Sequence, residues 1–170
     1  MEFIDVLNSR YSVRDYLDKE VEQEKIDKIL KSAQIAPTGK NTQCQQIYVL
    51  KSKEAIDKIR SLTKCAFNAP LVFLNCANLD RQCILSKTGK SLKETDVAIV
   101  QTYMMLTAQD LGLSTCWVCL FVPDEVKKAF NLPENVEPLN LLLVGYEGEN
   151  SQINERHFDK LDISETVSYL

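Results

Sequence analysis

The sequence contains few of the residues that break regular structure, with 5 glycines and 5 prolines in 170 residues. It has one histidine, one tryptophan and no stretch long and apolar enough to form a membrane span. Apolar residues make up 45% of the chain, which excludes a fibrous or disordered protein and predicts one folded domain over residues 1–170. The net charge of −4 argues against a general nucleic-acid-binding protein, although a local basic site remains possible.

The start of the chain and its cysteines bear on the cellular compartment. Glu2 and Asp5 stand where a secretory signal would carry positive charge, and no long apolar run follows them. We therefore expect a cytoplasmic protein whose six cysteines are reduced thiols, most of them in the core. Because there is one histidine and no second closely spaced cysteine pair, no metal site is expected.

Apolar periodicity predicts helices and strands that alternate along the chain. Helical spacing indicates helices over residues 3–7, 21–36, 53–64, 96–111 and 123–130. Apolar runs indicate buried strands over residues 46–50, 69–77, 115–118 and 139–146. The predicted class is therefore α/β or α+β, with helices on the outside of a sheet whose strands are buried on both faces.

Two features fit a single compact domain poorly. The predicted helix over 96–111 is apolar nearly all round, and the tail over 149–170 is too polar to form a core of its own. An obligate homodimer would account for both features, if helices formed the interface and the tail extended over the partner subunit.

The stretch RYSVRDY, residues 10–16, places two arginines and a serine at alternating positions. If this stretch is extended, Arg10, Ser12 and Arg14 lie on one side of it. Two guanidinium groups and a hydroxyl suit a phosphate or another oxygen-rich anion. The alternative is a solvated turn in which Arg14 pairs with Asp15 or Asp18.

Two further stretches carry groups suited to a ligand. In IAPTGKNTQ, residues 35–43, Pro37 ends a helix, and Asn41 and Gln43 offer donors and acceptors of the kind that a planar heterocycle requires. The alternative is an ordinary turn between a helix and a strand. In GLSTCWVCLF, residues 112–121, a Cys-x-x-Cys pair raises the alternative of a thiol–disulfide site, but it lies late in an apolar run rather than at the start of a helix.

Together, these stretches make the chain resemble the nitroreductase-like family of FMN-dependent oxidoreductases over essentially its whole length. The family motifs are Arg-x-Ser-x-Arg, then Ala-Pro-Ser/Thr-x-x-Asn-x-Gln, then Gly-Leu-Gly/Ser-Thr/Ser-Cys-Trp-Ile/Val. In this sequence they correspond to Arg10, Ser12 and Arg14, to Ala36, Pro37, Thr38, Asn41 and Gln43, and to residues 112–118. The resemblance implies an α+β fold of the three-layer α/β type, with a central mixed, mainly antiparallel sheet flanked by helices, and a domain-swapped dimer.

The resemblance also implies roles for individual residues. Arg10 and Ser12 would hold the FMN phosphate and ribityl chain, and Arg14 would point at the pyrimidine edge of the ring, where positive charge stabilises reduced flavin. Asn41 and Gln43 would reach the flavin from the opposite subunit. A second cation near the C-terminus would be Lys160, or its neighbour Arg156. The full implied set is Arg10, Tyr11, Ser12, Arg14, Pro37, Thr38, Asn41, Gln43, Trp117, Val118, Cys119, Leu120, Arg156 and Lys160.

The implied function is hydride transfer from NADH or NADPH through flavin N5 to a nitroaromatic, quinone or similar acceptor, by a ping-pong mechanism. The cofactor carries this chemistry, so no catalytic side chain is expected. Where the family has proline and an aromatic after Gln43, this chain has Cys44 and Gln45, and Cys119 and Leu120 replace a glycine-rich stretch. A flavin carrier or sensor without efficient turnover is therefore an alternative, as is a thiol redox protein using Cys116 and Cys119.

Residues 78–93 are polar and are expected to form a loop or lid. Arg81, Lys87 and Lys90 could meet the phosphates of the nicotinamide donor there. The alternative is that they belong to a solvated charged loop.

Overall fold

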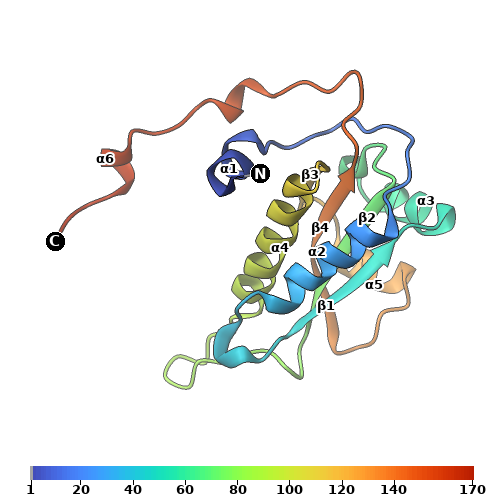
Figure 1. Ribbon diagram of the computed structural model, residues 1–170. Coiled ribbons are helices and arrows are strands. Elements are labelled where there is room, and N and C mark those ends of the chain that lie inside the picture. Colours follow the sequence, from blue (N-terminus) through green and yellow to red (C-terminus); the bar gives the residue numbers. More distant parts are fainter. Residues whose placement is uncertain (1) are drawn as a thin grey trace.

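The computed structural model describes residues 2–170 and contains one open four-stranded sheet (Figure 1). The strands are β1 (Gln45–Leu50), β2 (Leu71–Asn78), β3 (Ser114–Val118) and β4 (Val136–Gly145). Their order is β1-β2-β4-β3, and every neighbouring pair is antiparallel. A short parallel bridge between Ser12 and Thr115 extends the sheet beyond β3.

Helices cover both faces of the sheet because side chains of successive strand residues point to opposite sides. On one face, Leu71 and Phe73 pack with α2 (Gln23–Ile35) and α4 (Lys93–Asp110). On the other face, Val72 and Leu74 pack with α3 (Lys53–Leu62) and α5 (Pro123–Ala129). The predicted three-layer α+β class is therefore confirmed.

Two element boundaries differ from those predicted. Helix α4 begins three residues before Asp96, because the Asp96 N–H donates to the Leu92 carbonyl and continues the helical ladder backwards. Strand β4 begins at Val136 rather than after Pro138, although proline cannot donate to a strand partner. The register between β2 and β4 shifts between Asn75 and Cys76, opposite Pro138, and this bulge accommodates the proline.

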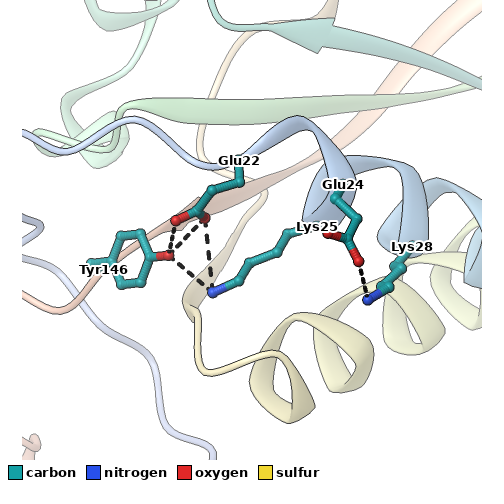
Figure 2. Close-up of polar contacts among 5 residues, drawn as sticks. All are labelled: Glu22, Glu24, Lys25, Lys28 and Tyr146. Atoms are coloured by element: carbon teal, nitrogen blue, oxygen red, sulfur yellow. Dashed lines mark hydrogen bonds and ion pairs between the residues drawn. The ribbon is translucent and has the colours of Figure 1, made fainter.

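Tyr146, directly after β4, joins the sheet to the first turn of α2. Its hydroxyl donates to a Glu22 carboxylate oxygen at 2.7 Å, and the Lys25 ammonium donates to the same hydroxyl at 2.9 Å. Figure 2 shows the three side chains meeting at the start of the helix. The Lys19 ammonium lies 3.7 Å from the centre of the Tyr146 ring. These contacts connect the start of α2 to the strand end from which the C-terminal tail leaves.

Both ends of the chain expose apolar side chains. Helix α1 (Phe3–Ser9) buries Val6 but exposes Phe3 and Ile4. Beyond the short helix η3 (Glu155–His157), the tail and its helix α6 (Ile163–Thr166) run away from the body of the molecule (Figure 1). Its exposed apolar residues are Phe158, Leu161, Ile163, Val167, Tyr169 and Leu170. Among residues 2–170, no helix is both long and apolar enough to cross a bilayer.

Candidate functional site

The segment that carries Arg10, Ser12 and Arg14 is extended, and one side of it is fixed in the core. The Val13 N–H donates to the Thr115 carbonyl at 2.9 Å, and Val13 is almost fully buried. Tyr16 is also buried, and its hydroxyl donates to the Val13 carbonyl. Because side chains alternate along an extended chain, burying Val13 turns its neighbours Ser12 and Arg14 away from the core.

A cleft of about 260 Å³ lies beside this segment and is lined by Tyr11, Ser12, Arg14, Asn154, Arg156 and His157. The Arg14 guanidinium donates to the Ser12 carbonyl at 3.1 Å, which orients it along the cleft. Within residues 2–170, no ion pair involves Arg10, Arg14 or Arg156. The cleft is therefore lined by cationic groups whose charge no carboxylate neutralises.

Asp15, the acidic neighbour proposed for Arg14, is occupied elsewhere. One of its carboxylate oxygens accepts from the Asn68 side chain at 3.1 Å, and the other accepts from the Asn150 backbone N–H at 3.1 Å. The alternative of a solvated turn with an Arg14–Asp15 pair is therefore wrong. Asp15 instead attaches the start of the C-terminal tail to the N-terminal segment.

Tyr11 makes the second attachment between the two ends of the chain. Its hydroxyl donates to the Glu147 carboxylate, and its ring meets His157 edge-on with centroids 6.3 Å apart. Burial, followed by the hydrogen bond to Glu147, raises the pKa of Tyr11. The Asn154 side chain then accepts from the Arg156 N–H at 3.1 Å, so Arg156 stands at the start of η3, beside Ser12. Lys160 lies further along the exposed tail and is not part of this cleft.

A second, smaller cleft of about 150 Å³ lies at the end of β3. Arg14 lines both clefts, and so it stands at the junction between them. Val118 is buried, whereas Cys119 and Leu120 are exposed, and the Trp117 ring N–H donates to the Cys119 sulfur at 3.2 Å. The other lining residues are Cys65, Phe67, Cys116 and Trp117. Neither Cys65 nor Phe67 was singled out in the sequence, because the turn that carries them reaches this cleft only through the fold.

The loop carrying Asn41 and Gln43 is held by a buried carboxylate. The Asp96 side chain accepts from the Gly39 N–H at 2.8 Å, and Asp96 itself is 2% exposed. Thr38 accepts from the Gln43 N–H at 3.0 Å and closes the loop, in which Lys40, Asn41 and Gln43 have positive φ. The exposed side chains of Asn41 and Gln43 are thus presented on a rigid turn that follows Pro37.

Within one chain, the two sets of predicted site residues lie at opposite ends of α4. Asp96, which holds the Asn41 loop, is in the first turn of the helix. Thr115, which holds Ser12, comes shortly after its last turn. The 18 residues of α4 span about 27 Å. A single chain therefore does not bring Arg10, Ser12 and Arg14 together with Asn41 and Gln43.

The thiols are mostly core residues, as predicted: Cys44, Cys76, Cys83 and Cys116 are buried, and Cys119 is exposed. Burial raises the pKa of Cys116, although the nearby guanidinium groups of Arg14 and Arg10 oppose this. A raised pKa reduces the fraction of reactive thiolate, which is the opposite of what a thiol redox site requires. The geometry thus disfavours Cys116 and Cys119 as a redox-active pair.

Comparisons with known proteins identify the family and the fold of this chain. The family model described as the nitroreductase family matches residues 7–75 and 85–146. A nitroreductase family protein from Clostridium difficile 630 is 43% identical, with 99% of this chain and 98% of that chain covered and a TM-score of 0.93. An FMN-dependent nitroreductase from C. difficile R20291 is 28% identical, with 98% of both chains covered and a TM-score of 0.79. An FMN reductase [NAD(P)H] of Bacillus subtilis strain 168 is 28% identical over 88% of this chain and 68% of its own length.

Replacing Asp96 by alanine should loosen the Asn41 loop. The Gly39 N–H would lose its partner, and because Gly39 is half-buried the cost should be about 1 kcal/mol, the lower end of the range for a buried donor without an acceptor. We expect the free energy of unfolding in urea to fall by that amount, and the amides of residues 39–44 to exchange faster with deuterium. Glu94→Ala in the same helical turn is the control, because Glu94 is exposed. Unchanged exchange in Asp96→Ala would show that Asp96 does not hold the loop.

Alkylation at pH 8 should distinguish the exposed cysteine from the buried cysteines by their rates of reaction. Burial raises the pKa of Cys76 to about 12, so about one thiol in ten thousand is a thiolate at that pH. We expect iodoacetamide to modify Cys119 first in the folded protein, and Cys76 and Cys116 only after denaturation, as read by peptide mass spectrometry. The Cys119→Ser variant is the control. Modification of folded Cys116 as fast as Cys119 would restore the thiol redox hypothesis.

Proposed function

Because the chain belongs to the nitroreductase family, we propose that it is a homodimeric FMN-dependent oxidoreductase. In this proposal it takes hydride from NADH or NADPH and passes it to a nitroaromatic, quinone or similar planar acceptor. The observation that carries the proposal is the cleft lined by Ser12, Arg14 and Arg156, in which neither arginine forms an ion pair with a carboxylate of the described residues 2–170. The names of the FMN-dependent nitroreductase and of the FMN reductase among its relatives support the cofactor.

The donor set of this cleft fits a phosphate monoester. Guanidinium groups bind phosphate oxygens through paired, charge-assisted hydrogen bonds, and a serine hydroxyl can donate a further one. Arg14 and Arg156 come from the two ends of the chain, and Ser12 lines the same cleft. Arg10 stands two residues before Ser12 in the same segment, and its charge, like that of Arg14, acts on the Cys116 thiol. These residues would hold the phosphate and the ribityl chain of FMN.

The smaller cleft would take the flavin ring. Bound FMN supplies the hydride-accepting chemistry, and the protein supplies position and electrostatics. Arg14 stands at the junction of the two clefts, so its charge would favour negative charge on the near edge of the ring. The exposed segment of Cys119 and Leu120 would border the ring on one side.

A second copy of the chain would complete the site. Asn41 and Gln43 lie the length of α4 away from Ser12 in the same chain, so they would reach the ring only from the partner subunit. The exposed apolar side chains of α1 and of the tail would be covered in the same dimer, the tail of residues 149–170 lying over the partner. Burial of such apolar area is the usual driving force for association of subunits.

The reaction itself would need little from the side chains. Neither cleft contains a carboxylate that could act as a general base, and His157 is engaged with the rings of Tyr11 and Phe158. One open face would then serve the donor and the acceptor in turn, which gives a ping-pong scheme. The six cysteines are free thiols. Because cytoplasmic proteins rarely form disulfides, the cytoplasm is the compartment that we propose.

The visible spectrum is the first test of this function. The protein incubated with FMN and desalted should remain yellow, and the colour should bleach when NADH or NADPH is added without oxygen. The same yellow sample should sediment as a dimer.

Each contrary outcome has a distinct meaning. Retained colour without bleaching by either nucleotide would favour a flavin carrier or sensor. A yellow monomer would contradict the shared site, and a colourless protein would contradict FMN binding.

Arg156 and Lys160 form a matched pair that tests the phosphate cleft. Arg156 lines the cleft, whereas Lys160 lies outside it. Arg156→Gln should weaken FMN binding by about 1.5–3 kcal/mol, the contribution of charge-assisted hydrogen bonds, which corresponds to roughly a 10- to 150-fold increase in Kd. Arg10→Ala should have an effect of similar size.

The FMN dissociation constant is measured by quenching of flavin fluorescence, and Lys160→Gln should leave it unchanged. If Lys160→Gln raised the Kd for FMN more than Arg156→Gln did, the residue that binds the phosphate would be Lys160 in the tail rather than Arg156 in η3.

A further inference from the structure

The segment predicted as a loop or lid contains an ordered hairpin over residues 83–92. The Leu92 N–H donates to the Cys83 carbonyl at 2.9 Å, and the Leu85 N–H donates to the Lys90 carbonyl at 2.9 Å. An antiparallel bridge joins Ile84 and Ser91 between these two bonds. The tip turns at Gly89, whose φ of 68° favours glycine. The hairpin therefore holds its exposed tip residues in a defined position.

The base of this hairpin rests directly on the loop that carries Asn41 and Gln43. A methyl group added at Gly39 would lie 3.0 Å from Cys83 Cβ and 3.0 Å from Leu92 Cδ1, so the Gly39 backbone packs closely against side chains at the base of the hairpin. Figure 1 shows the yellow-green hairpin beside the light-blue segment that leads into β1. The hairpin therefore lies directly beside the Asn41 loop, and a ligand that reached this loop would also come close to the hairpin.

The hairpin and the loop together carry positive charge on a chain of net charge −4. Four exposed cations lie here: Lys40, Arg81, Lys87 and Lys90. None of the four is in an ion pair within residues 2–170. Asp80 is engaged by the Asn135 side chain, and the Lys93 ammonium is paired with Glu137 at 2.6 Å. The charge of the hairpin tip is therefore uncompensated.

Arg81 connects the two elements. Its guanidinium lies 3.3 Å from the Gln45 carbonyl oxygen and 3.4 Å from the Gln46 side-chain oxygen, both at the start of β1. Arg81 precedes the hairpin, and Gln45 and Gln46 follow the Asn41 loop, so these contacts link the two elements. Lys87 and Lys90 at the tip and Lys40 in the loop remain available to an anion.

We propose that Lys87 and Lys90, with Lys40, bind the phosphates of the dinucleotide electron donor. This inference rests on the proposed function, in which Asn41 and Gln43 reach the flavin ring of the partner subunit. A dihydronicotinamide stacked on that ring would direct its phosphates outward, past the loop and towards the hairpin. The flavin phosphate has its own cations at the other end of the chain, which leaves this second basic site for the second anionic ligand.

The test measures flavin reduction by rapid mixing without oxygen, with three donors: NADPH, NADH, and N-benzyl-dihydronicotinamide, which has no phosphate. In the Lys87→Gln/Lys90→Gln variant, the apparent Kd for NADH and NADPH should rise roughly five- to tenfold, as expected for two exposed charge contacts. The limiting rate of reduction, the Kd for FMN and all constants for the benzyl compound should stay unchanged. The matched control is Lys53→Gln/Lys128→Gln, which removes the same charge from the helices on the other face of the sheet.

The arms of this experiment identify the phosphate involved. An equal loss for NADH and NADPH would assign the lysines to the pyrophosphate, and a loss for NADPH alone would assign them to the 2′-phosphate. Both results support the inference. If the apparent Kd changed equally for all three donors, or for none of them, the inference would be wrong. The proposed function would still stand in that case, because the donors would still reduce the flavin. If the wild-type protein holds no flavin or no donor reduces it, the proposed function fails, and this inference fails with it.

Binding of a ligand that cannot react provides a second, independent test of the proposed phosphate site. ADP-ribose carries the pyrophosphate but no nicotinamide, so it cannot transfer hydride. In the FMN-loaded protein labelled with nitrogen-15, it should shift the amide resonances of residues 86–91, and the shifts should diminish in 0.5 M salt because exposed charges are screened. Shifts confined to residues outside the hairpin and the Asn41 loop would contradict the assignment.

Discussion

The length of α4 is the constraint on which the rest of the structure depends. Its 18 residues cross the sheet in one straight span, with Asp96 buried at one end and Ala108 at the other. The turn of Asn41 is fixed at the first end by the Asp96 carboxylate, and Ser12 is fixed near the second end by Thr115. No movement of a side chain could close a gap of about 27 Å. A ligand that needs both sets of groups therefore requires two copies of the chain.

Local signals in the sequence predicted much of the fold. Pro37 ends α2 and Pro123 starts α5, because the proline ring fixes φ and removes the backbone N–H. Gly112 has a φ of 72° just after α4, a conformation that glycine adopts without steric cost. The order β1-β2-β4-β3 could not be read from the sequence, because the pairing of β4 between β2 and β3 depends on contacts between distant segments. The start of α4 was missed because Lys93 and Glu94 are polar and show no apolar periodicity.

The candidate site, like the fold, was predictable where the signal was local and unpredictable where it depended on contacts between distant segments. Alternation in RYSVRDY predicted that Arg10, Ser12 and Arg14 would share a side if the stretch were extended, and the burial of Val13 accounts for the extended conformation. Spacing in the sequence could not show whether Arg156 or Lys160 lines the cleft beside Ser12, because this depends on where the tail is attached to the rest of the chain. That attachment is made by Tyr11 and Asp15, whose partners lie more than 130 residues away in the sequence.

These attachments link the binding of a cofactor to the ordering of the tail. The cations of the phosphate cleft come from both chain ends, so the cleft exists only while residues 147–157 lie against residues 11–15. Fixing a backbone residue costs about 1–2 kcal/mol, and the exposed tail beyond His157 has few contacts of its own to offset this. A partner subunit that covered Phe158 and Leu161 would supply the missing contacts and would stabilise the cleft from outside. Since any ligand that binds only the ordered form shifts the same equilibrium, the flavin, the tail and the second subunit should stabilise one another.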